Sequence, residues 1–172
     1  MNRFTDHAAR RLVSSRRPPF GRATALLALL LGLGSTGCSR GFVLTTPAGF
    51  AELEDEESYA YRATSAEGVV LAVRHEPNEP YGDLAFWTGA VDAQLRRNGY
   101  VADKALDVES VSGLRGRQLR YHLMREGREQ SFWATVYVTE AHVVVVETGG
   151  DRAFFEKLES AVSAAITSLD IG

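Results

Sequence analysis

The sequence is poor in the residues that define several protein classes, with one cysteine, five prolines and 16 glycines among 172 residues. One thiol cannot form an internal disulfide, and 45% hydrophobic with 24% charged residues excludes a collagen or a disordered chain. The uncharged run at 23–37 has 15 residues, whereas a helix needs about 20 to cross a bilayer. We therefore predict one globular domain, and we favour a cleaved leader over a permanent transmembrane helix.

Positive charge is scarce outside the N-terminus. Residues 1–37 contain six arginines and one aspartate, so residues 38–172 carry a net charge of −8, although the whole chain has −3. A protein that tracks nucleic-acid phosphates needs the opposite excess. We therefore expect no nucleic-acid partner.

The N-terminal segment has the layout of an export signal: an arginine-rich stretch, then the uncharged run, then small residues directly before Cys38. The residues Ser35-Thr36-Gly37-Cys38 resemble the lipobox of bacterial lipoproteins. The resemblance implies cleavage between Gly37 and Cys38 and attachment of lipid, palmitate included, to Cys38. Residues 1–37 would then be the signal peptide, 38–41 the lipidated cysteine with its tether, and 42–172 the folded domain.

The resemblance also implies a location. A lipidated Cys38 would hold the protein on the extracytoplasmic side of a membrane, and Ser39 is similar to the residue that directs lipoproteins to the outer membrane in bacteria with two membranes. A plain secretory signal and a short anchor helix are the alternatives. The sequence also leaves open whether export uses the general or the twin-arginine route.

Apolar residues at helical spacing predict two long helices. The first covers 84–98, with Asp83 as its N-cap and Gly99 after its end, and it places Trp87 in the core. The second begins after Gly149-Gly150, with Asp151 as its N-cap, and continues to Leu169.

Alternating apolar residues and turn signals predict short strands before the first helix and between the two helices. The expected segments are 41–45, 59–65, 68–75, 101–106, 108–112, 115–124, 129–139 and 141–147. Most of them follow one another through tight turns, which favours antiparallel pairing. The fold class is therefore α+β, with an antiparallel sheet of six to seven strands packed by the two helices.

The order of these segments resembles the PsbP-like family, which includes an extrinsic photosystem II subunit, a Ran-binding import factor and bacterial lipoproteins. The resemblance rests on residues 42–50 (FVLTTPAGF), 111–121 (VSGLRGRQLRY), the strand pair 131–147 and the helix end at 165–169. It implies an α/β/α sandwich for residues 42–172. No photosystem-specific or Ran-binding motif is visible, so the resemblance implies no particular activity.

Motifs for catalysis are missing. The chain has no GxSxG sequence, no phosphate-binding loop and no dinucleotide-binding glycine pattern. Residues 75–79 (HEPNE) begin like a zinc-protease helix, but Glu79 replaces the second histidine and Pro77 prevents a helical turn, which predicts a loop after a strand. We expect a protein that is not an enzyme and that has neither a metal nor a cofactor.

Basic residues gather on the predicted hairpin 115–139. The candidate binding residues are Arg115, Arg117, Arg120, His122, Arg125 and Arg128. Arginine forms bidentate pairs with carboxylates and phosphates, so this set is the best candidate for an acidic partner or lipid head groups. The alternatives are ion pairs with the acidic run 52–57 and protection of an edge strand by charge. The acidic run itself is expected to be a solvated loop rather than a calcium site.

Two functional hypotheses follow. The first is a lipid-anchored, non-enzymatic protein of the cell envelope that binds another protein or supports an assembly. The second is a carrier of a small lipid or anion, held between sheet and helix near Arg120 and His122. The sequence leaves the partner and the oligomeric state open.

Overall fold

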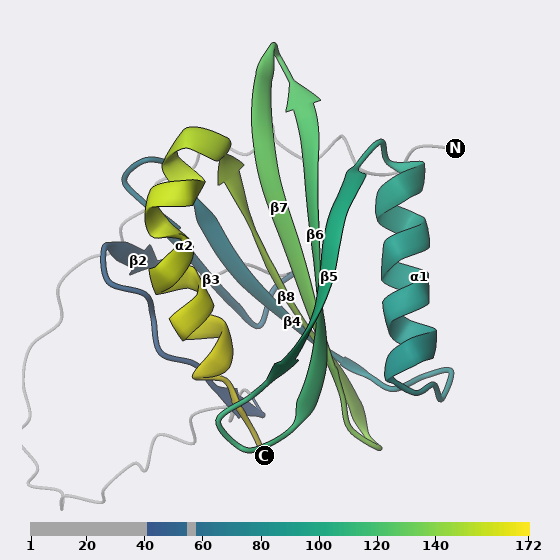
Figure 1. Cartoon of the computed structure of the whole chain (residues 1–172). Helices are drawn as coiled ribbons and strands as arrows, with labels where there is room; N and C mark the ends of the chain where they lie inside the picture. The colour runs from purple at the N-terminus through teal and green to yellow at the C-terminus, as the bar shows by residue number, and fades with distance from the viewer. Residues whose placement is uncertain (1–40, 55–57) are drawn as a thin grey trace, which may run out of the picture. The chain divides into compact units, whose positions relative to one another are not determined.

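The computed structural model describes residues 41–54 and 58–172, which form a seven-stranded antiparallel sheet, a two-stranded sheet and two helices (Figure 1). The predicted signal peptide, Gly37 and Cys38 lie outside the described residues. In spatial order the large sheet contains β2 (Phe50–Glu52), β3 (Tyr61–Ser65), β4 (Val70–Pro77), β8 (His142–Asp151), β7 (Arg128–Val138), β6 (Arg115–Arg125) and β5 (Val101–Glu109). This confirms the α+β class and the antiparallel sheet.

A tight turn sets the register of the central hairpin. Glu126 and Gly127 both have positive φ angles, 52° and 74°, and they join β6 to β7 as a two-residue turn whose twist matches that of the strands. Arg125 therefore pairs with Arg128, and the register continues to Gly116 opposite Tyr137. A tight turn was expected between the segments 115–124 and 129–139, and the structure confirms it.

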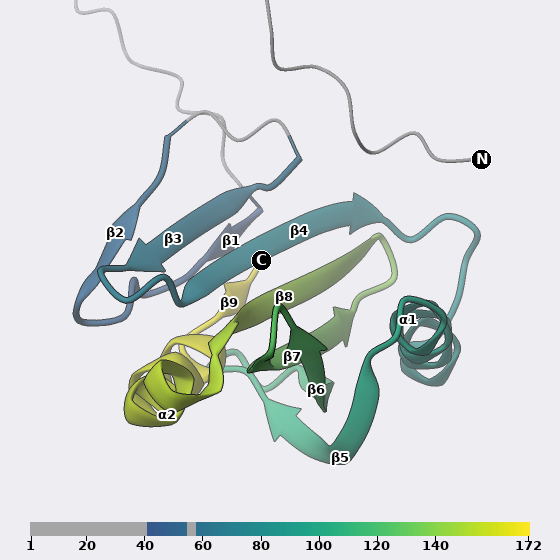
Figure 2. The ribbon, with the colours of Figure 1, turned by 90° about the horizontal axis from the view of Figure 1, so that it is seen from above.

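The helices α1 (Leu84–Arg97) and α2 (Arg152–Thr167) cover opposite faces of the sheet (Figure 2). Side chains alternate along a strand, and Trp133 of β7 packs against Phe155 of α2. On the other face, the Tyr121 hydroxyl of β6 donates to Asp92 of α1. Each helix begins as predicted, because Asp83 accepts a hydrogen bond from the Phe86 amide and Asp151 accepts one from the Ala153 amide.

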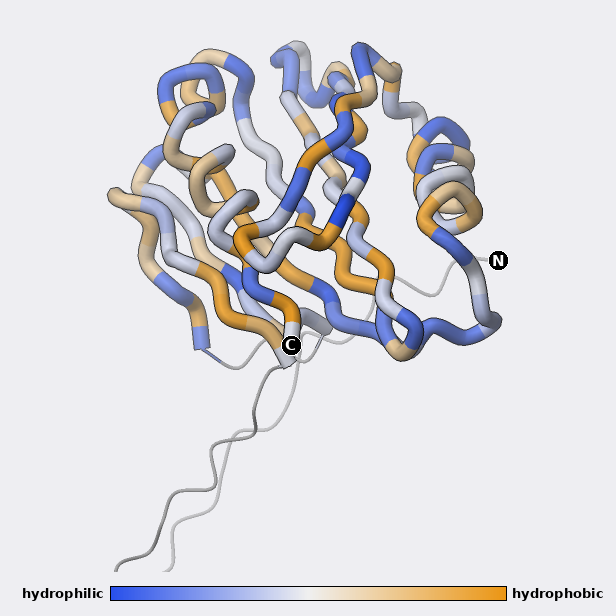
Figure 3. The backbone as a smooth tube through the Cα atoms, turned by 60° about the horizontal axis from the view of Figure 1, so that its bottom comes forward, coloured by the Kyte–Doolittle hydropathy of each residue, from blue (hydrophilic) through white to orange (hydrophobic). Residues whose placement is uncertain are grey.

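The main hydrophobic core lies between the sheet and α2. Helix α2 buries Phe155, Val162, Ala165 and Ile166. The strands contribute fully buried side chains that include Leu71, Val73, Tyr137, Val144 and Val146. Burial raises the pKa of Tyr137 to about 12. In Figure 3 the hydrophobic colouring gathers on the central strands, in agreement with this core.

The α1 face is packed more loosely. None of the residues of α1, all of which the structure describes, is fully buried, and the predicted core residue Trp87 is half-buried. Two polar contacts fix the helix instead: Trp87 Nε1 donates to Asn78 Oδ1 at 2.7 Å, and Tyr121 donates to Asp92 Oδ1 at 2.7 Å. Hydrogen bonds from Arg96, and then from Tyr121, lower the pKa of the Asp92 carboxyl.

Several expected boundaries differ. Residues 101–106 and 108–112 were expected as two strands, but β5 runs unbroken from Val101 to Glu109, with an irregularity between Ala102 and Lys104. Strand β8 continues through Gly149 and Gly150, which pack so closely on neighbouring residues that an added Cβ would lie 3.0 Å from Ser131 O and from Val69 Cγ2, respectively.

The chain ends also differ from the expectation. Helix α2 ends at Thr167, before Leu169, and the helices have ordinary lengths of 14 and 16 residues. The short strands β1 (Phe42–Val43) and β9 (Asp170–Ile171) pair with each other, which brings the start of the described domain to its C-terminus. The strand expected over 41–45 is therefore limited to two residues.

Candidate functional site

The six predicted binding residues are divided between the two faces of the sheet. Gly116, Gln118, Arg120 and His122 share the α2 face of β6, because Arg120 pairs in register with Trp133. The odd-numbered residues share the other face with Tyr121. Arg115, Arg117 and Arg125 therefore belong to the α1 face, and Arg128 follows the turn. Strand alternation therefore separates these residues, which share one hairpin but not one face of the sheet.

Arg120 contacts three other side chains of the protein. Its guanidinium carbon lies 3.5 Å from the centroid of the Trp133 ring, which is a cation–π contact. Its Nη1 donates to Glu159 of α2 at 2.7 Å, and its Nε donates to Gln118 at 2.7 Å. Gln118 is buried and donates in turn to Thr135 at 3.1 Å. Arg120 therefore joins α2 to the sheet.

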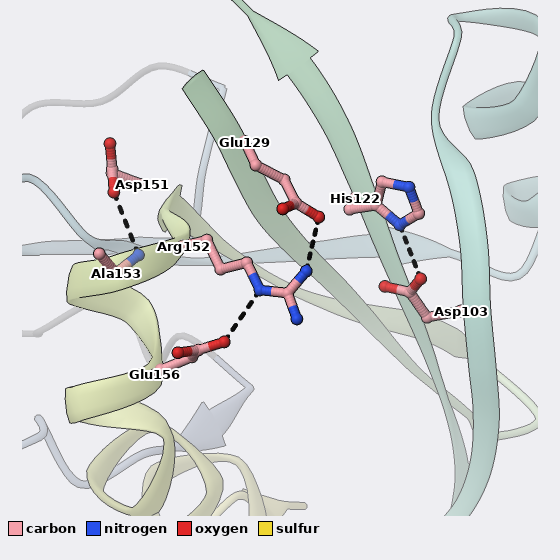
Figure 4. A network of polar contacts seen from close by, with 7 residues as sticks. All are labelled: Asp103, His122, Glu129, Asp151, Arg152, Ala153 and Glu156. Atoms are coloured by element: carbon pink, nitrogen blue, oxygen red, sulfur yellow. Dashed lines mark hydrogen bonds and ion pairs between the residues drawn. The ribbon is translucent and has the colours of Figure 1, made fainter. Parts of the chain in front are cut away.

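His122 is paired with a carboxylate from the neighbouring strand. Its Nδ1 lies 2.6 Å from Asp103 Oδ1, at the irregularity of β5 (Figure 4). The His122 side chain is 31% exposed and that of Asp103 is 47% exposed. The pair thus lies at the rim of the space between sheet and α2.

Arg152 completes this rim from the start of α2. Figure 4 shows its guanidinium between Glu129 of β7 and Glu156 of α2, at 2.5 Å and 2.9 Å. On the same hairpin, Arg128 lies 3.9 Å from the N-cap Asp151. The carboxylate partners of these arginines come from β7, α2 and the N-cap.

The side chains around Arg120 enclose a small cleft, which we call the α2 cleft. It has a volume of about 220 Å³ and is lined by residues that include Arg120, Trp133, Arg152, Phe155 and Glu159. Sites for small molecules usually have about 300–1,000 Å³. Because Arg120 and Arg152 are both paired with carboxylates, the α2 cleft is a poorer place for an anion than the sequence suggested.

The segment 75–79 forms no helix, as Pro77 predicted. His75 belongs to β4, and its ring stacks on that of His142 from β8 at a centroid distance of 4.3 Å. Burial, and then the neighbouring His142, lower the pKa of His75. Asn78 is buried and donates to the carbonyls of Gly82 and Thr139. This segment therefore positions α1 through Asn78.

Neither a membrane span nor a metal-binding cluster is found in the described residues. Within 41–54 and 58–172, no helix has the length and hydrophobicity needed to cross a bilayer. The same residues contain no group of three or more His, Cys, Asp or Glu placed to hold a metal ion. Of the acidic run, Glu52 and Glu54 are exposed, and residues 55–57 lie outside the description.

Comparison with known proteins identifies the fold. The sequence matches no protein-family model and no curated protein. The solved structure of cyanobacterial PsbP from Synechocystis is similar to this chain, with a TM-score of 0.56 and 10% identity over 83% of this chain and 99% of that one. The fold is PsbP-like. The predicted resemblance is confirmed at the level of architecture.

Two further structures share this architecture. LpqN of Mycobacterium tuberculosis, a protein involved in cell envelope biogenesis, has a TM-score of 0.61 and 12% identity over 74% of this chain and 81% of that one. PA94 of Pseudomonas aeruginosa, a protein of unknown function, has a TM-score of 0.51 and 13% identity over 79% and 86% of the two chains. At these identities the likeness concerns the fold alone.

Proposed function

We propose that the chain is a lipid-anchored, non-enzymatic protein of the cell envelope whose PsbP-like domain binds another protein or supports an assembly. The fold likeness to LpqN, a protein of cell envelope biogenesis, supports an envelope role. The lipobox-like residues Ser35–Cys38 support the anchor. Between Cys38 and the start of β1 at Phe42 lie three residues, which reach about 10 Å when extended. The domain would thus act next to the membrane surface.

The observation that carries the protein-binding part is a pair of exposed aromatic side chains at the start of α1. Tyr81 is 76% exposed and Phe86 is 51% exposed. The Phe86 ring packs directly on Gly82, where an added Cβ would lie 2.3 Å from the ring. Tyr81 directly precedes Gly82, so both exposed aromatic residues belong to the segment at the start of α1. Exposed aromatic residues are enriched where proteins bind one another.

The anchor is tested by replacing the cysteine. Cys38→Ala removes the one thiol that could take a lipid, so the protein is expected to move from the membrane fraction to the aqueous fraction after cell lysis. Ser39→Ala is the matched control and should stay with the membrane. Unchanged incorporation of labelled palmitate into Cys38→Ala would contradict lipidation at this residue.

The partner surface is tested by photo-crosslinking in intact cells. A crosslinking residue at position 81 is expected to give a discrete product of higher mass, because Tyr81 belongs to the proposed contact. The same residue at Glu67, which is exposed in the turn between β3 and β4, is the control. The product should disappear when Phe86→Ser is added. Equal labelling at both positions would speak against a specific partner at this patch.

A further inference from the structure

The α1 face contains an open groove that runs along the helix. Two adjoining cavities of about 430 Å³ and 460 Å³ lie along α1 and share Thr88 and Arg117. Strands β5 and β6 form the opposite wall, and Figure 1 shows α1 running beside both strands. We call these two cavities the α1 groove. Each has about twice the volume of the α2 cleft, and each is within the usual range for a ligand site.

Most of the accessible surface of the α1 groove is apolar, although the charged residues Asp83, Asp92, Arg96, Asp103 and Lys104 also line it. Leu84 and Ala85 line its lower part, and Ala105 and Leu119 line its upper part. Gly89 lies at the middle of the helix, where an added Cβ would meet no atom within 4 Å. The helix side formed by Leu84, Ala85 and Gly89, with free space beside Gly89, suits an apolar chain.

Arg117 provides a cation where the two cavities meet. Its Nη1 lies 2.6 Å from Asp107 Oδ1, but the Asp107 side chain is 87% exposed and that of Arg117 is 37% exposed. An exposed ion pair of this kind contributes little stability. Arg117 can therefore exchange Asp107 for the anion of a ligand more readily than Arg120, which Trp133, Gln118 and Glu159 hold on the other face.

Thr88 adds an unused hydrogen-bonding group beside Arg117. Its Oγ1 is buried and has no partner within the described residues. A buried hydroxyl without a partner is costly. The absence of a fully buried side chain on α1, whose residues are all described, shows that this helix packs less closely on the sheet than α2 does.

We propose that the α1 groove binds a single-chain anionic amphiphile, with a carboxylate or phosphate head at Arg117 and an apolar chain along Leu84, Ala85 and Gly89. Charge complementarity at Arg117 favours this ligand over an uncharged one. An added peptide strand fits less well, because the edge strand β5 has an irregularity after Ala102 and carries four charged residues in nine. The proposal does not depend on the anchor at Cys38.

The test uses the full chain with Cys38→Ala, so that no lipid of its own competes. Binding is measured by calorimetry with decanoate, decyl phosphate, decanol and butyrate, each below the concentration at which it aggregates. We expect saturable one-to-one binding of at least one of the two charged long-chain probes. Decanol should bind at least about tenfold more weakly, because it cannot pair with Arg117. Decanoate and decyl phosphate distinguish the two kinds of head group.

Two variants locate the site. Arg117→Gln should weaken binding of the charged probes about tenfold and leave decanol unchanged. Arg128→Gln, on the same hairpin but outside the groove, is its control. Gly89→Leu should abolish binding of all long-chain probes by filling the groove, whereas Ala93→Leu, at an exposed position of the same helix, should not.

The proposal is overturned if neither charged long-chain probe binds, or if butyrate and decanol bind as well as decanoate. It is also overturned if Gly89→Leu binds the probes like the parent chain while both proteins show the same unfolding transition. Either result leaves the anchor and the crosslinking experiment at Tyr81 unaffected, because neither uses the groove.

Discussion

Helix α2 buries four side chains against one face of the sheet, whereas α1, described over its whole length, buries none completely against the other. The arginines of β6 follow the same division. Arg120, on the α2 face, has an aromatic, an amide and a carboxylate partner, whereas Arg117, on the α1 face, has one exposed carboxylate. The α2 face thus has the properties of a structural core, and the α1 face has those of a binding surface.

Replacing one valine on each helix by alanine tests this difference in packing. Of the predictions made here, it has the largest expected effect on the free energy of unfolding. Val162 of α2 is fully buried, and Val91 of α1 is half-buried. Val162→Ala should lower the free energy of unfolding by about 2–3 kcal/mol, because two methyl groups leave a cavity in the core. Val91→Ala should lower it by less than about 1 kcal/mol. Urea denaturation with an unchanged slope is the measurement, and equal losses would show that both helices are packed alike.

Much of the local structure could be predicted because its causes are local. Asp83 and Asp151 were expected as N-caps, and each accepts the amide hydrogen bond that a cap requires. In β7, Phe132 and Val136 lie on one face and Trp133 on the other, as the alternation of side chains along a strand requires. These features depend on residues a few positions apart, so the sequence pattern contains them.

The missed features depend on residues distant in sequence. The β1–β9 pairing joins Phe42 to Ile171, and neither segment has a sequence pattern that identifies the other as its partner strand. Arg120 was expected to be available to a ligand, but its guanidinium pairs with Glu159 and stacks on Trp133. The pair with Glu159 forms because α2 packs on this face of the sheet. The α1 groove was also missed, because it depends on how far α1 lies from β5 and β6. A hydrophobic stripe on a helix predicts which side turns inward but not how closely it packs.

Replacing Arg120 and Arg117 one at a time separates a structural role from a role in ligand binding. The expected effect on stability is smaller than that of Val162→Ala. Arg120→Gln should lower the free energy of unfolding by about 1–2 kcal/mol, since it removes the cation–π contact and a hydrogen bond to Glu159. Arg117→Gln should change it by less than about 0.5 kcal/mol, because its pair with Asp107 is exposed. Both are measured by urea denaturation of the Cys38→Ala chain.

Ligand affinity should change in the opposite order: Arg120→Gln should bind decanoate like the parent, whereas Arg117→Gln should not. If Arg117→Gln instead cost as much stability as Arg120→Gln, its guanidinium would be a structural group, and the contrast between the two faces would be lost.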